Sequence, residues 1–517
     1  MDEPVLRLEA SQPYPHVVCC RGPSGHSHTT TPEPLRTGIP FARGALQPGS
    51  LSGLSLVDDA GHPCVTQSKP LLHWSDGSVR WLQVDWVATA LVGRTWSLQP
   101  AASLGARANI SIERRLNEST IRNEFWAASI TPSNPIISFA DHNGNQFAEL
   151  MLNVSAYDQT LTLGTDTIIE ILDTGPVRAS FSVTSRLVFK APIDVRLTVH
   201  LFAALPWIQV ELSVTNPGPA THPGGTWPLG AGGSIFLDEL SMALVPTKPA
   251  SKSALSQDDG SPLSECHRFD LTQASSGGEN WPSTNHVTAD GTVTLPYCGY
   301  HADIDGAATE GLRATPLAAI GDNPQLVLSM PYFWQNFPKR VQGDPATGLT
   351  LSLFPLAQGV PHELQGGERK THSFNLWVNP YRPTPIHELE PMRAPAVVGP
   401  DPSWCESVGA IPFVQSESPG AKTAHALLIA QVLDGEHSFS NKREQLDEFG
   451  WRNFGDVLAD HELSYYQESL PLISHYNNQY DIVFGCAQQF LRTADARWFD
   501  DMSTLALHVS DIDIYQT

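Results

Sequence analysis

Hydrophobic and polar side chains alternate along two neighbouring stretches in the middle of the chain, from Val195 to Leu201 and from Ile208 to Val214. A period of two places every second side chain on the same face of an extended strand. Pro206 lies between the stretches, and the interior of a strand would not tolerate it. The pattern therefore predicts two strands. Similar runs recur between about residues 120 and 390, which is typical of a large antiparallel β-sandwich.

The N-terminal part of the chain also shows short strand patterns between turn signals. In "HWSDGSVRWLQVDW", Asp76-Gly77 supplies residues that accept the positive φ angles of a tight hairpin turn. The stretch from Val79 to Val87 is rich in β-branched and aromatic residues, so it is predicted to be the second strand of this hairpin. Asp76 and Arg80 are expected to form a structural ion pair. The region resembles a small β-barrel.

The period changes after the proline-rich stretch "NPYRPTPIHELEPMRAPAVVGPDP". One apolar helix face is predicted from the spacing of Tyr480, Val483, Phe484, Ala487, Phe490 and Leu491. A second helix is predicted through Trp498 and Val509, and an earlier one over 421–434, closed by Gly435 at the C′ position. The stretch 250–290, rich in Ser, Gly and Asp, is predicted to be a surface excursion.

Composition narrows the class of protein. The 517 residues carry a formal charge of −23, with 54 acidic and 31 basic residues and no basic run, so nucleic acid is a poor partner. The seven cysteines lack metal-site spacing and are expected to be reduced thiols. No leader-like start and no apolar run of about 18 residues is present, so we expect a cytoplasmic protein without membrane association. The sequence leaves the oligomeric state open.

Eight motifs then identify a resemblance. The motifs are "GIPFARGAL", "HWSDGSVRWLQVDW", "TWPLGAGGSIFLDEL", "PYFWQNFPKRV", "PHELQGGERKTHSF", "GWRNFGDV", "SHYNNQYD" and "SDIDIYQT". In this order they resemble the exo-rhamnogalacturonan lyase-like family. The resemblance implies a multidomain, mainly β protein: a RIFT-type β-barrel over 1–118, a central antiparallel β-sandwich over 119–395 and a C-terminal α/α toroid from 396 to 517. A complete toroid is a closed double ring of helices. About three helices are predicted before Thr517, so we expect an incomplete toroid or a fragment.

The resemblance also implies a chemistry, β-elimination in an anionic, uronic-acid-containing oligosaccharide. A lyase of this kind needs a base, a donor that neutralises the carboxylate and a proton source for the leaving oxygen. In "SHYNNQYD", His475 or Tyr476 is the expected base or acid. Asn477 and Asn478 are expected to bind the carboxylate at a helix N-terminus. Asp481 is expected either to contact substrate or to hold a loop.

Further substrate contacts are expected in two other motifs. In "GWRNFGD", Arg452 is the expected carboxylate clamp, with Trp451 as a sugar-stacking face and Asn453 as a polar contact. Tyr332 and Trp334 in "YFWQNFP" either face the sugar or belong to the core. No cofactor or metal is predicted, and a requirement for a divalent cation such as Ca²⁺ is left open.

Two rival functions remain open at this point. A glycoside hydrolase would use a carboxylate pair such as Asp456 with Asp511 or Asp513, and a separation of about 6.5 to 9.5 Å would suit inversion. Asp511 and Asp513 are otherwise expected to be structural or to contact substrate. A protein that only binds carbohydrate would use the barrel and the sandwich without catalysis.

Overall fold

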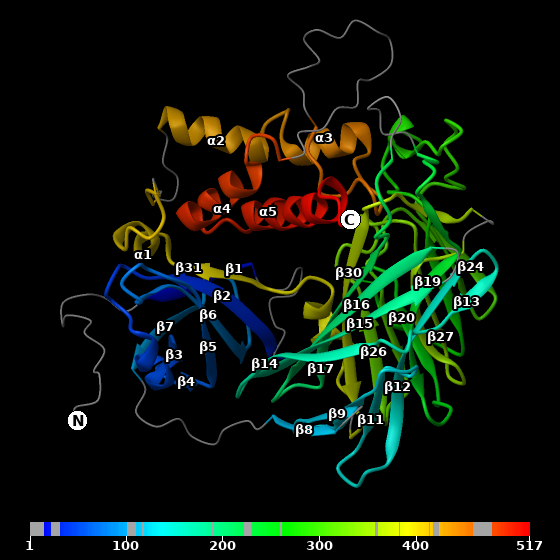
Figure 1. Cartoon of the computed structure of the whole chain (residues 1–517), viewed down its shortest axis with the longest axis horizontal. Coiled ribbons are helices and arrows are strands. Elements are labelled where there is room, and N and C mark those ends of the chain that lie inside the picture. Colours follow the sequence, from blue (N-terminus) through cyan, green and yellow to red (C-terminus); the bar gives the residue numbers. More distant parts are fainter. Residues whose placement is uncertain are drawn as a thin grey trace, which may run out of the picture.

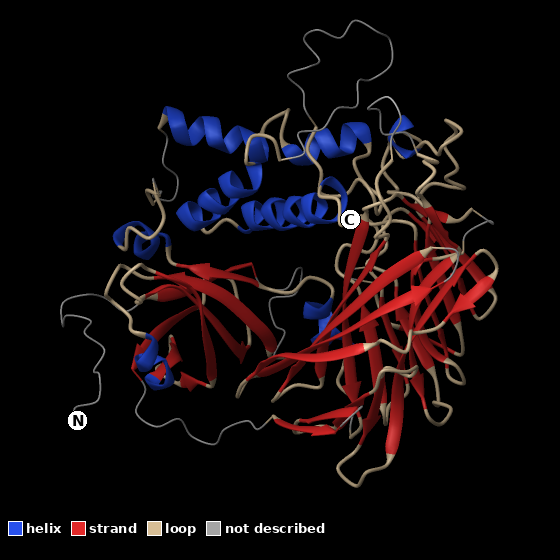
Figure 2. Cartoon of the chain, viewed as in Figure 1, coloured by secondary structure: helices blue, strands red, loops and turns tan. Residues whose placement is uncertain are grey.

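The chain folds into a β-barrel, a β-sandwich beside it and a group of helices that lies across both (Figure 1). The computed structural model describes residues 15–21, 31–100, 110–115, 118–188, 191–221, 229–258, 261–356, 360–381, 383–412, 414–416, 423–458 and 478–517. Figure 2 shows that strands dominate and that the α-helices are confined to the C-terminal part. The predicted mainly β, multidomain class is confirmed. No helix within the described ranges is long and apolar enough to cross a membrane.

The barrel is built from two small antiparallel sheets around the Trp86–Trp96 pair, whose rings meet edge to face with centroids 5.3 Å apart. Its described elements are β1 (His16–Arg21), β2 (Glu33–Pro40), η1 (Pro48–Gly53), β3 (Leu54–Asp58), β4 (Pro63–Cys64), β5 (Thr66–His73), β6 (Val79–Ala88), β7 (Thr95–Pro100) and β31 (Val397–Pro400). The last strand comes from beyond the expected boundary at 395, since β31 pairs with β1. The barrel therefore closes only after the chain has passed through the sandwich.

The predicted hairpin is present, but its side chains pair differently. Gly77 adopts a φ of +84° between β5 and β6, as the Asp-Gly turn requires. The expected ion pair between Asp76 and Arg80 is wrong. Asp76 instead accepts hydrogen bonds from Ser78, and Arg80 reaches the carbonyl of Ala410 at 2.7 Å. Arg80 therefore ties the barrel to the segment that follows α1 (Pro402–Ser407).

The sandwich packs two large antiparallel sheets over one apolar core. Among the described residues, the first sheet has twelve strands: β8 (Ser111–Arg115), β9 (Glu118–Arg122), β10 (Ala127–Ile130), β11 (Ile137–Ala140), β12 (Gln146–Ala156), β13 (Gln159–Leu161), β19 (Glu239–Pro246), β22 (Phe269–Gln273), β23 (Tyr300–Ile304), β24 (Ala307–Gly311), β27 (Lys339–Asp344) and β28 (Gly348–Phe354). The strand β8 begins before the expected boundary at 118, so the sandwich starts earlier than expected.

The second sheet faces the first across the core. In the described part of the chain it has nine strands: β14 (Ile168–Thr174), β15 (Arg178–Val188), β16 (Pro192–Phe202), β17 (Trp207–Thr215), β20 (Ser253–Ser256), β21 (Ser264–Cys266), β25 (Leu317–Ile320), β26 (Gln325–Ser329) and β30 (Arg369–Asn379). A separate pair is formed by β18 (Ile235–Leu237) and β29 (His362–Leu364), and the 3₁₀ turns are η3 (Thr284–His286) and η4 (Ile386–Met392). The alternation around Pro206 correctly predicts β16 and β17, which are antiparallel neighbours. The predicted excursion over 250–290 is wrong, because it contains β20, β21 and β22.

The described helices are α1 (Pro402–Ser407), α2 (Ala424–Asp434), α3 (Phe439–Leu446), α4 (Ile482–Thr493), α5 (Ala496–His508) and the π-helical turn η6 (Val509–Asp513). Gly435 follows the last residue of α2 as its C-cap, one position before the predicted C′, with a φ of −81°. The apolar face predicted for α4 is only partly covered. Phe490 is buried, whereas Tyr480 and Phe484 are 61% and 46% exposed.

A buried ion-pair network joins the barrel to the sandwich. On β6, the Asp85 carboxylate accepts hydrogen bonds from Arg36 Nε of β2 at 2.7 Å and from Arg178 Nε of β15 at 3.1 Å. Arg178 also donates to Asp173 at 2.8 Å, and its backbone N–H donates to Gln67 of β5 at 2.9 Å. The side chains of Arg178 and Asp85 are only 4% and 3% exposed. A charge removed from water in this way requires its partner.

The end of the chain is anchored by buried carboxylates. Asp511 accepts from Arg369 Nε at 3.0 Å and from the Thr371 N–H of β30 at 2.7 Å. His508 Nε2 lies 3.2 Å from Asp456 and 3.6 Å from Asp513. Burial alone would lower the pKa of His508, but the hydrogen bonds and charges of the two carboxylates outweigh it and raise the pKa to about 9. This cluster holds the segment around Asp456 against α5.

We expect Arg178→Met to lower the free energy of unfolding by about 3 kcal/mol, because Asp173 and the buried Asp85 lose a shared cationic partner. The matched control is Arg186→Met on the same strand. Arg186 pairs with Asp194 at 2.6 Å on the surface, so the loss there should stay below about 1 kcal/mol. Urea unfolding measures both variants, and equal midpoints for the two would contradict the role of Arg178.

The His508 cluster predicts a pH dependence of stability. Because the folded-state pKa of about 9 lies above the ordinary histidine pKa of 6.5, the stabilisation is fully present below pH 6.5 and is lost as the pH rises through 9. Its full size is on the order of 3 kcal/mol. Unfolding curves between pH 6 and 10 should show this loss in the wild type, whereas His508→Gln should flatten it. The exposed His425→Gln variant of α2 serves as control, and an unaltered pH profile in His508→Gln would refute the prediction.

Candidate active site

A cleft of about 590 Å³ opens where the twelve-stranded sheet meets the segment after α3. Four parts of the chain form most of its walls: the loop around 285–297, the stretch 337–340 at the start of β27, residues 355–356 with 360–363, and residues 449–453. Leu229, Phe236, Thr272 and Ala274 complete the lining. Most of the wall is apolar. Its ionisable side chains include His286, Arg340, Glu363 and Arg452. An apolar hollow with a few convergent polar groups is the usual form of a small-ligand site.

The most reactive arrangement in the cleft is a histidine held by a buried carboxylate. His286 Nε2 lies 2.7 Å from Asp447 Oδ2, and the two side chains are 6% and 0% exposed. Ser276 Oγ donates to the other oxygen of Asp447. The Nδ1 atom of His286 has no hydrogen-bond partner among the described residues. A carboxylate in this position orients the ring and stabilises its protonated form, as the acid of a catalytic triad does.

Local backbone structure places both members of this pair. Asp447 caps the C-terminus of α3 with a φ of +54°, a left-handed conformation that Asp tolerates better than most residues. His286 is the last residue of η3, whose cap Ser283 accepts a hydrogen bond from the Asn285 N–H at 3.1 Å. The edge of the Phe337 ring packs against His286 at a centroid distance of 5.2 Å. The histidine is therefore fixed by its helix turn, its carboxylate and an aromatic wall.

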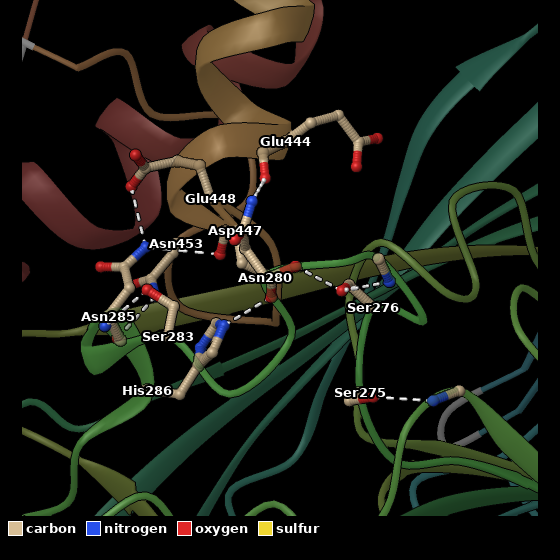
Figure 3. A network of polar contacts seen from close by, with 12 residues as sticks. Ser275, Ser276, Asn280, Ser283, Asn285, His286, Glu444, Asp447, Glu448 and Asn453 are labelled. Atoms are coloured by element: carbon tan, nitrogen blue, oxygen red, sulfur yellow. Dashed lines mark hydrogen bonds and ion pairs between the residues drawn. The ribbon is translucent and has the colours of Figure 1, made fainter.

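A network of amides extends this support on both sides (Figure 3). Asn285 Nδ2 donates to Glu448 at 3.3 Å, and Asn453 Nδ2 donates to the Asn285 carbonyl at 3.1 Å. Asn280 Nδ2 donates to the Glu444 carbonyl at 3.0 Å. The sandwich loop that carries His286 is thus tied to the segment that carries Asp447 at several points. Such a network holds a site in one geometry before a ligand arrives.

Trp451 and Arg452 form the wall on the other side of the cleft. The Trp451 ring is 9% exposed and packs edge to face against Phe354 at 4.9 Å. The Arg452 guanidinium lies 4.6 Å from the Trp451 ring centroid. Its Nη2 donates to the Glu363 carbonyl at 2.5 Å and to Glu368 Oε2 at 3.1 Å. The Nη2 group of Arg452 is therefore already hydrogen-bonded to Glu363 and Glu368. The predicted binding of a substrate carboxylate by Arg452 would have to use the remaining N–H groups of the guanidinium.

The cleft brings together three of the predicted site residues, Trp451, Arg452 and Asn453. His475, Tyr476 and Asn477 lie outside the described residues. Asn478 and Asp481 flank the start of α4 with φ angles of +55° and +56°, and Asn478 Oδ1 accepts from the Val483 N–H at 3.1 Å. Neither of these two residues lines the cleft.

The remaining predicted residues have internal partners instead of lining the cleft. Tyr332 Oη donates to Asp500 of α5 at 3.1 Å, and Asp500 pairs with Arg21 of the barrel. Trp334 packs against Phe449 at 4.9 Å and beneath Arg313 at 4.1 Å. Both aromatic residues connect the sandwich to the helices. The carboxylates of Asp456, Asp511 and Asp513 are buried in the anchors described above, so they do not form an open hydrolytic pair.

Sequence reasoning missed His286 and Asp447. They are 161 positions apart, and His286 falls in the stretch predicted to be a surface excursion. Only two features of the sequence point to this pair, and both are weak. Asp447 lies four residues before the predicted site residue Trp451, and Ser283, three residues before His286, is a residue type that is common at helix N-caps. Within the described part of the chain, no group of three or more His, Cys, Asp or Glu is arranged to hold a metal ion. The seven cysteines are free thiols, as predicted.

Comparison with known proteins adds a family match for the barrel. Residues 25–100 match the model of the PcRGLX-like N-terminal RIFT barrel domain. No curated protein matches the chain.

Among solved structures, a protein in the glycosyl hydrolase family 38 from Enterococcus faecalis matches at 10% identity, with a TM-score of 0.42, 75% of this chain and 47% of that chain covered. An alpha-mannosidase from Enterococcus faecalis V583 matches at 11% identity, with a TM-score of 0.41 and coverages of 75% and 46%. The matched regions thus span about half the length of these two structures. Their similarity is too low to carry an argument about activity. The family match is specific to the barrel: residues 25–100 match the PcRGLX-like N-terminal RIFT barrel domain.

Proposed function

We propose that this chain acts on a uronic-acid-containing oligosaccharide and cleaves it by β-elimination in the cleft beside His286. The family of the barrel suggests a carbohydrate-active enzyme. The observation that carries the proposal is the His286–Asp447 pair, whose ring lines the same cleft as Arg452 and Trp451. A base and a cation are two of the elements that elimination from a uronate requires, and Trp451 adds an aromatic face for the sugar ring.

The chemistry assigns a separate role to each group. The base removes the proton from the carbon next to the uronate carboxylate, and the electron pair moves to form a double bond as the glycosidic oxygen leaves. His286 Nδ1 is the proposed acceptor of that proton, since Nε2 faces Asp447. Asp447 stabilises the imidazolium that results. The N–H groups of Arg452 that do not bind Glu363 and Glu368 are proposed to face the carboxylate, where negative charge accumulates.

The leaving oxygen must also receive a proton. His475 and Tyr476 remain the proposed sources, on the basis of the motif resemblance. Trp451 is proposed to contact the apolar face of the sugar and Asn453 to contact its hydroxyl groups. The hydrolase alternative has less support, because Asp456, Asp511 and Asp513 are committed to His508, Arg369 and Thr371.

The proposal predicts different changes in kcat and KM when the proposed base is removed and when the proposed cation is removed. His286→Ala should lower kcat by roughly 10²-fold or more with little change in KM, because a general base is lost while binding groups remain. Asp447→Asn should also lower kcat, because the ring loses its orienting charge. Arg452→Ala should raise KM and lower kcat together. The assay is the ultraviolet absorbance of the unsaturated uronate released from a rhamnogalacturonan oligosaccharide.

The matched control is His142→Gln, a surface histidine of the same sheet, which hydrogen-bonds the Glu124 carbonyl at 2.8 Å. Its kinetics should equal those of the wild type. Unchanged turnover in His286→Ala would remove this residue from the mechanism. Release of reducing sugar without ultraviolet absorbance would show that the protein hydrolyses its substrate and does not cleave it by elimination. The absence of any product from the wild-type chain would contradict the proposed activity.

A further inference from the structure

A groove of about 500 Å³ lies between the barrel and the helix α4. One wall comes from β2, β5 and β6 of the barrel, and the other comes from α4, α5 and residues 410–412 after α1. The barrel strand β31, against which α4 packs, contributes Val398 and Pro400 (Figure 1). The groove shares no lining residue with the cleft. Its size falls within the usual range of small-ligand pockets.

The helical wall of the groove is apolar. Phe484, Ala487 and Leu491 follow one another on one face of α4, at spacings of three and four residues, and all three line the groove. Phe499 and Met502 of α5 extend this wall. The groove therefore contains the part of the predicted apolar face of α4 that the protein itself leaves uncovered. Apolar side chains left exposed at a concave surface indicate that something binds there.

The barrel wall presents a flat aromatic surface. Trp81 of β6 lies close over Gly38 of the neighbouring strand β2, and a Cβ atom at Gly38 would come within 3.3 Å of the indole ring. Glycine at this position therefore lets the ring lie near the strand, where it lines the groove together with Ile411. The two walls are thus an indole face and a helix face, and an apolar chain between them would contact both.

The charges at the groove have the opposite sign to the charge of the whole chain. No Asp or Glu is found among the described residues that line it, although the chain carries 54 acidic and 31 basic residues. Its lining includes Arg36, whose Nε binds Asp85, and Arg80, which is hydrogen-bonded to a backbone carbonyl and has no carboxylate partner in the described ranges. The exposed Lys69 pairs in the strand register with Gln83 of the same wall. Such a surface attracts anions locally.

We propose that this groove binds an amphiphilic anion, with its carboxylate at Arg80 and Arg36 and its apolar chain between Trp81 and α4. The apolar walls suit an alkyl chain, and the guanidinium groups suit one carboxylate. A second copy of this chain fits less well, because a two-fold contact through the groove would bring the same cations face to face. The site does not depend on the elimination proposed for the cleft.

The test is the binding of octanoate to the whole chain, measured by calorimetry and by saturation-transfer NMR. Octanol and octylammonium are the matched probes, because they have the same alkyl chain with a neutral and a cationic head. Octanoate should bind about tenfold more tightly than octanol, which is the usual effect of a charge-assisted hydrogen bond, and octylammonium should bind most weakly. The net charge of −23 by itself would predict the reverse order for the two ions.

Two variants and a control locate the binding. Arg80→Gln should weaken the binding of octanoate about tenfold and leave that of octanol unchanged. Ala487→Trp should abolish the binding of both, because the larger side chain occupies the groove. Leu428→Ser is the control, since this leucine of α2 is 64% exposed and does not line the groove, and it should bind like the wild type. Equal unfolding midpoints establish that the variants are folded.

Several results would overturn the inference. These are no binding of octanoate to the wild type, equal affinities for octanoate and octanol, and unchanged binding in Ala487→Trp. A mass in sedimentation that rises with protein concentration, falls in Ala487→Trp and does not respond to octanoate would assign the groove to a second copy instead. Elimination in the cleft should be the same in Ala487→Trp and in the wild type, so failure of either proposal leaves the other standing.

Discussion

A carboxylate removed from water must be paired, and this constraint decides how the candidate site is held. Asp447 is completely buried, and its two oxygens are used by Ser276 of the sandwich and His286 of the cleft loop. An unpaired charge at such a position would cost several kcal/mol. The helix α3 therefore cannot move away from the sandwich without exposing a charge or leaving it unpaired. The same contact that stabilises the joint also orients the histidine ring.

Paired carboxylates perform this joining role at several other places in the molecule. Asp85 connects the barrel to the sandwich through Arg178, and Asp500 of α5 contacts both Arg21 of the barrel and Tyr332 of the sandwich. Asp511 fixes the end of the chain to β30. Apolar burial alone is non-directional and would let the three regions slide against each other. Charge pairs with defined geometry fix the barrel, the sandwich and the helices in one position relative to each other. A cleft whose walls come from different regions keeps its shape only if that position is constant.

The elements that could be predicted from sequence are those with a local cause. Strands β16 and β17 follow from side-chain alternation, and the hairpin at Gly77 follows from its positive φ. The pairs that form the site have no local cause. From its position in the sequence, Asp76 is a plausible ion-pair partner of Arg80, but in the structure its carboxylate accepts a hydrogen bond from Ser78, which is closer along the chain. His286 ends η3 in the connection between β22 and β23, and Asp447 caps α3, so the two residues meet only in the folded chain, a relation that no spacing in the sequence reveals.

The net charge of −23 constrains how an anionic ligand can approach. At long range the surplus of carboxylates repels a polyanion, and this repulsion is screened beyond about 10 Å at moderate ionic strength. Attraction must therefore come from the few cations at the cleft, chiefly the part of Arg452 that Glu363 and Glu368 leave free. A ligand whose single carboxylate reaches this guanidinium would gain from it at short range, whereas each further carboxylate would meet only the repulsion of the acidic surface.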